Sequence, residues 1–111
     1  MELTSHEDGG ITVLTVTGDL VIGEPETTFK KKITQLLEEG RVNLLVDLSA
    51  VGFLDSSGLG ALVRALTQSQ KEGGQTKLLK AGPQVRKLLQ MTKLDSVFEI
   101  HDDMETAVSS F

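Results

Sequence analysis

Residues 42–66 read "VNLLVDLSAVGFLDSSGLGALVRAL", and the fold class of the chain follows from this stretch. Residues 43–48 form a short, nearly continuous apolar run, which is typical of a strand buried at the centre of a sheet. Apolar side chains then return at i, i+3, i+4 and i+7, the spacing of one helix face: Leu59, Leu62, Val63 and Leu66. A buried strand followed directly by an amphipathic helix predicts an α/β domain. On that helix we expect Arg64 and Gln68 to face water and Leu62, Val63 and Leu66 to be buried.

The segments before the central strand predict a β-hairpin and a helix. Residues 1–7 and 11–18 flank Asp8-Gly9, a common two-residue hairpin turn. The second of these strands carries apolar side chains on both faces, which indicates a strand covered on both sides. Residues 23–40 predict a helix because apolar side chains recur along one face: Phe29, Ile33, Leu36 and Leu37.

The segments after residue 66 continue the alternation of strands and helices. We expect a strand at 76–80, a helix at 83–91, a strand at 97–100, and a last helix opening at Asp102 or Asp103. Asp102 and Glu105 have the spacing of a capping box. We therefore predict a single α/β domain over residues 1–111. Its mixed, partly parallel sheet has about four to five strands, with about four helices.

Composition excludes several classes of function. The chain has 111 residues, a net charge of −5 and 4% aromatics, so a nucleic-acid partner is not expected. It contains no Cys, which excludes disulfides and thiol chemistry. No apolar run is long enough to span a membrane, and no segment resembles a signal peptide. We expect a cytoplasmic protein that does not enter the membrane.

The polar stretch Asp55-Ser56-Ser57-Gly58 lies between the central strand and the following helix, where one capping residue would suffice. Three candidate caps in a row exceed that need. Gly58 and Gly60 each cost a helix about 1 kcal/mol relative to Ala. Glycines at an exposed helix start let another surface approach the backbone closely. The stretch therefore predicts an accessible hydroxyl that a partner can reach.

Catalytic and metal-binding roles for this stretch have little support. A nucleophilic Ser needs a base, and the two histidines, His6 and His101, stand in no triad setting. The glycines lack the Lys of a phosphate loop. Asp47 and Asp55 lack EF-hand spacing. We expect neither an enzyme nor a bound metal or cofactor. Phosphorylation is the remaining use of the hydroxyl, because a helix start accepts an anion well.

The segment "VDLSAVGFLDSSGLGALVRAL" at 46–66, together with "VTGDL" at 16–20, resembles STAS domains, in particular bacterial anti-sigma factor antagonists. The resemblance covers essentially the whole chain. It implies that Ser56 is phosphorylated, with Ser57 the alternative that physics alone leaves open. It also implies a partner-binding surface: Gly18, Asp19, Leu20, Asp55, Ser57, Gly58, Leu59 and Gly60. After "GDL" this chain has Val21-Ile22-Gly23, where many members carry an Asp.

The function implied by this resemblance is a switch between partners. The unphosphorylated antagonist binds a protein that is both anti-sigma factor and serine kinase, with ATP bound by that partner, and so releases the sigma factor. Phosphorylation abolishes binding, and a serine phosphatase restores it. The alternative from the same resemblance is a STAS subunit of a lipid ABC transporter or of a signalling scaffold.

Overall fold

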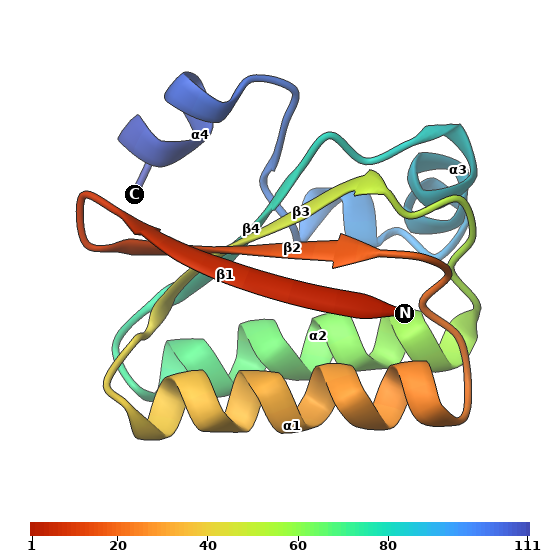
Figure 1. Cartoon of the computed structure of the whole chain (residues 1–111). Coiled ribbons are helices and arrows are strands. Elements are labelled where there is room, and N and C mark those ends of the chain that lie inside the picture. The colour runs from red at the N-terminus through yellow and green to blue at the C-terminus, as the bar shows by residue number, and fades with distance from the viewer.

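A five-stranded mixed sheet with strand order β1-β2-β3-β4-β5 lies at the centre of the computed structural model, which describes residues 1–111 (Figure 1). The strands are β1 (Glu2–Asp8), β2 (Ile11–Thr17), β3 (Asn43–Ala50), β4 (Gln75–Leu79) and β5 (Ile100–His101). The helices are α1 (Glu24–Glu38), α2 (Ser56–Lys71), α3 (Pro83–Met91) and α4 (Met104–Ser109), with a 3-10 turn, η1, at Leu94–Ser96. β1 and β2 are antiparallel and every other pair is parallel. The predicted fold class is confirmed.

The hairpin turn lies one residue later than the sequence predicts. Asp8 still belongs to β1, where it pairs with Ile11, and the two turn residues are Gly9 and Gly10. Both have positive φ, 58° and 84°. Turns of this kind need positive φ at both positions, so a Gly-Gly pair fits at lower cost than Asp-Gly.

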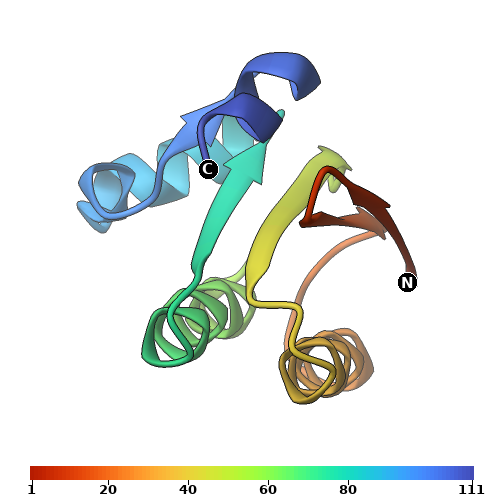
Figure 2. The same cartoon turned by 90° about the vertical axis from the view of Figure 1, so that its left-hand side faces the viewer.

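The two faces of the sheet are covered unequally, as Figure 2 shows. The larger core lies between the sheet and helices α1, α2 and α3, and it includes Leu14, Leu62 and Leu89. A smaller core on the opposite face is covered by α4 through Ala107, which packs with Val13. The expectation of a second strand covered on both sides is confirmed. Helix α2 follows its predicted pattern for Leu62, Leu66 and Arg64, whereas Val63 and Gln68 are half-buried because both line a groove beside α1.

The C-terminal elements differ from the sequence prediction in two details. Asp103 caps α4, since its carboxylate accepts the Thr106 N–H at 2.9 Å. Asp102 instead pairs with Arg86, so the capping box predicted for Asp102 and Glu105 does not form. The last strand is Ile100–His101, later and shorter than 97–100, because η1 precedes it and Phe98 is buried in the larger core.

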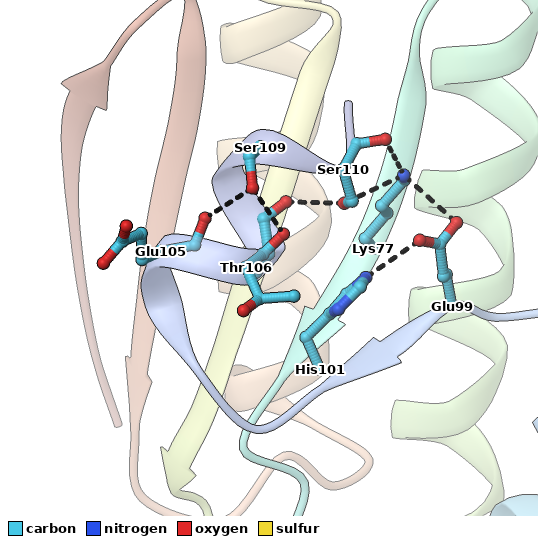
Figure 3. A network of polar contacts seen from close by, with 8 residues as sticks. Lys77, Glu99, His101, Glu105, Thr106, Ser109 and Ser110 are labelled. Atoms are coloured by element: carbon cyan, nitrogen blue, oxygen red, sulfur yellow. Dashed lines mark hydrogen bonds and ion pairs between the residues drawn. The ribbon is translucent and has the colours of Figure 1, made fainter.

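Helix α4 is attached to the sheet by a buried lysine (Figure 3). Lys77 of β4 is 3% exposed, and its Nζ donates to the carbonyl of Ser110 at 2.8 Å and to its hydroxyl at 3.0 Å. The same Nζ lies 3.1 Å from the Glu99 carboxylate and 4.7 Å from the ring centre of Phe111. The hydrogen bond from Lys77, and after it the one from His101, holds the pKa of Glu99 below its ordinary value. The buried charge is therefore fully partnered, as burial requires.

Candidate functional site

Helix α2 begins at Ser56, beyond the carboxyl end of β3, and its first turn is capped by the preceding residue. The backbone of Asp55 is extended, and its Oδ1 accepts the Gly58 N–H at 2.8 Å. Because Asp55 serves as the cap, the hydroxyls of Ser56 and Ser57 are not needed for that role. Ser56 is exposed, whereas Ser57 is half-buried. The helix start thus presents a hydroxyl to solvent.

The Asp55 carboxylate also connects two loops. Its Oδ2 accepts the Ile22 N–H at 2.9 Å, so it joins the loop after β2 to the start of α2. The hydrogen bond from Gly58 and then the one from Ile22 hold the pKa of Asp55 below its ordinary value of 3.8, because both favour the charged form. The segment 18–20, predicted as part of the partner surface, therefore lies beside the candidate phosphorylation site.

The segment before Ser56 is held on both sides. On one side Leu54 forms a parallel bridge with Leu20. On the other side the Gln84 amide of α3 makes two hydrogen bonds to Leu54: Nε2 donates to its carbonyl at 3.0 Å, and Oε1 accepts its N–H at 2.9 Å. Sequence reasoning missed Gln84. The only feature of the sequence that could have indicated a role for Gln84 is its position in the first turn of the helix that follows the parallel strand β4.

The two glycines of the motif have different roles. A Cβ on Gly58 would lie 2.1 Å from the Leu20 carbonyl oxygen, so this position must stay bare for the loop to pack against the helix. A Cβ on Gly60 would meet nothing within 4 Å, and Gly60 is exposed. The fold explains Gly58 and leaves Gly60 without a structural reason.

The other predicted partner-binding residues divide by exposure. Asp19 is exposed and Gly18 half-buried, while Leu20 and Leu59 are buried and support the surface from beneath. Two apolar side chains that sequence reasoning did not select are exposed here. Ile22 is 69% exposed and Phe53 46% exposed. In this chain the loop after β2 therefore presents the Ile22 side chain to solvent.

Neither histidine lies on the strand or the helix that flanks Ser56. His6 lies in β1 and His101 in β5, which are the two edges of the sheet, whereas Ser56 follows the central strand β3. The acidic and histidine side chains form no cluster of three that could hold a metal ion. None of the helices has the length and apolar content to cross a membrane.

Three features together define a class of small α/β domains: the five-stranded mixed sheet, the layer of three helices on one of its faces, and the start of α2, which exposes a hydroxyl to solvent. The chain belongs to the STAS domain family, whose model matches residues 2–107.

Comparison with individual proteins agrees with this assignment. The anti-sigma-B factor antagonist of Bacillus subtilis is 30% identical over 79 residues, which cover 71% of this chain and 72% of that protein. A crystal structure of a candidate anti-sigma factor antagonist of Thermotoga maritima aligns with a TM-score of 0.91 at 27% identity, covering 97% of this chain and 92% of the other. The fold is also that of the Bacillus protein SpoIIAA in its phosphorylated form, with a TM-score of 0.77, 21% identity and 98% of each chain covered.

Proposed function

We propose that this protein is an anti-sigma factor antagonist controlled by phosphorylation of Ser56. Its unphosphorylated form binds an anti-sigma factor that is also a serine kinase, and this releases the sigma factor. A serine phosphatase reverses the modification. The protein is then a substrate of enzymes in the cytoplasm, with no reaction of its own. Family membership and the similarity to the Bacillus subtilis antagonist support the general role.

The observation that carries the proposal is the exposure of Ser56 next to a neighbour that already caps the helix. Asp55 satisfies the Gly58 N–H, so modification of Ser56 breaks no hydrogen bond of the cap. Ser57 is half-buried at the edge of the α1–α2 groove, and so is less accessible to a kinase. The choice of Ser56 therefore rests on exposure in addition to the family resemblance.

Phosphorylation acts in this proposal by charge and crowding. A phosphoserine adds roughly −1.5 to −2 charge, and a helix start accepts it without unfolding. The kinase must bring the phosphates of its ATP close to the same hydroxyl, so a phosphoserine meets like charge, which can cost several kcal/mol. About 2.7 kcal/mol is enough to weaken binding a hundredfold.

The test uses the serine kinase of the same genome, purified and incubated with the protein and ATP. We expect mass spectrometry to find one phosphate on the wild type and on Ser57→Ala, and none on Ser56→Ala. The modified protein should bind the kinase at least a hundredfold more weakly, with NMR shifts limited to 53–60 and to the loop that Asp55 contacts. Phosphate on Ser57 alone, unchanged affinity, or shifts across the sheet would contradict the proposal. A transporter or scaffold subunit would show no such loss of affinity.

A further inference from the structure

A groove runs between α1 and α2 and opens beside the candidate phosphorylation site. The two helices lie side by side and begin at the same end of the molecule (Figure 1). The groove has a volume of about 590 Å³ and starts at Ser57 and Gly60. It continues along α2 past Arg64 to Lys71, with Lys30 on the α1 side. A partner that covers Ser56 is therefore adjacent to the opening of this groove.

The charge of the groove is opposite to that of the protein. The chain carries a net charge of −5, yet the lining of the groove from Ser57 to Lys71 contains three cations, Lys30, Arg64 and Lys71, and one acid, Glu26. Glu26 is already paired with Lys30 at 2.6 Å. Arg64 and Lys71 take part in no ion pair of the structure, so they are available to a partner. Two further acids, Glu38 and Glu72, line a second hollow that adjoins the groove at Gln68 and Lys71.

The floor of the groove allows close approach near its start. The position of a Cβ on Gly60 is empty, and the next residue along the groove on the same helix face, Val63, is half-buried. Helix α2 also carries no acid in its first turn. A segment that enters here meets bare backbone first and cations next. This arrangement gives Gly60 the role that the fold itself does not provide.

We propose that an acidic segment of the anti-sigma partner lies in the groove between α1 and α2, over Gly60 and against Arg64 and Lys71. The inference rests on the proposed function, whose partner it describes further. A guanidinium such as that of Arg64 binds carboxylates through two parallel hydrogen bonds. Complementary charge also accelerates association, in a way that salt screens. The acidic segment would in addition repel a phosphate on Ser56 and so reinforce release.

The test reverses two positive charges in the groove and, in a control, two positive charges outside it. Arg64→Glu with Lys71→Glu alters the groove, and Lys31→Glu with Lys87→Glu is the matched control, because both of its lysines are exposed and lie outside the groove. We expect the groove variant to bind the purified kinase at least tenfold more weakly than the control at about 50 mM salt. The difference should narrow as salt rises, because the Debye length falls from about 10 Å at 0.1 M to about 3 Å at 1 M.

The outcomes separate this inference from the proposed function. Urea unfolding of both double variants verifies that they are folded. If the wild type does not bind the kinase, both proposals fall. If the wild type binds, and the groove variant binds as tightly as the control, only the acidic segment is refuted. A loss of affinity in Gly60→Ala, with Arg64→Glu also impaired, would place the segment over the start of the groove.

Discussion

Substituting Ala for each glycine of the helix start should change stability in opposite directions. The Gly58 position faces backbone, since a Cβ would lie 2.1 Å from the Leu20 carbonyl oxygen and 2.8 Å from a methyl of Leu54. The carbonyl would have to retreat by about 1 Å, and overpacking of this kind typically costs about 1–3 kcal/mol. Helix propensity returns up to about 1 kcal/mol.

Gly60→Ala has only the favourable effect. Nothing lies within 4 Å of the added methyl, and the residue is inside α2. The gain should be about 0.5–1 kcal/mol, from helix propensity and the reduced freedom of the unfolded chain. We therefore expect a stabilised Gly60→Ala variant and a Gly58→Ala variant less stable than the wild type by up to about 2 kcal/mol.

Urea unfolding followed by circular dichroism measures both effects, since the chain has no Trp or Tyr for fluorescence. A change of 1 kcal/mol moves the midpoint by about 0.3–1 M. The reasoning would be refuted if Gly60→Ala unfolded at lower urea than the wild type, or if Gly58→Ala unfolded at the same concentration. Stabilisation of Gly60→Ala together with weaker binding to the kinase would show that the position is kept bare for the partner.

Three further variants test the supports of the site and the core. Asp55→Ala should lose about 1–2 kcal/mol at pH 7. The folded-state pKa of Asp55 lies below 3.8, so the stability difference between the wild type and Asp55→Ala should persist above pH 3.8. It should shrink as the pH falls through the folded-state pKa, because the carboxylate is then protonated. Urea titrations at several pH values measure this difference. Gln84→Leu should speed hydrogen exchange at the Leu54 amide, which loses its acceptor. Gln90 is exposed on the same helix, so Gln90→Leu is the control and should leave this exchange unchanged. Equal exchange rates in the two variants would argue against the contact between Gln84 and Leu54. Leu62→Ala should cost about 2–5 kcal/mol, and an unchanged urea midpoint would contradict its burial.

The elements that sequence analysis predicted well have strong local patterns. Strand β3 and helix α2 follow from an apolar run and a helical period, and α3 matches the predicted 83–91 because Pro83 marks its start. The hairpin turn and the cap of α4 were each displaced by one residue. In both places two adjacent residues suit the role, and a pattern within one segment does not distinguish them.

The contacts around the candidate site were predictable only where they are local. Capping preferences predict that one of the adjacent polar residues caps α2, and the structure shows that Asp55 does so, while Ser56 as the phosphorylated residue stays a prediction. The contact of Gln84 with Leu54 spans 30 residues and leaves no periodic trace in the sequence. Leu20 illustrates the same limit, because the bridge that buries it joins two loops that no pattern within either one relates.

The Gln84 contact has a consequence for how any partner can bind. The backbone of Leu54 is flanked by Leu20 on one side and by the Gln84 amide on the other, so the Gln84 side chain takes the place of a neighbouring strand. An open strand edge recruits extended peptides by main-chain hydrogen bonding, and it also invites self-association. Here that edge is closed directly before Ser56. Under the proposed function, the kinase could therefore not draw this segment into its own sheet as it would a flexible peptide, and would have to recognise the folded surface by its shape and side chains.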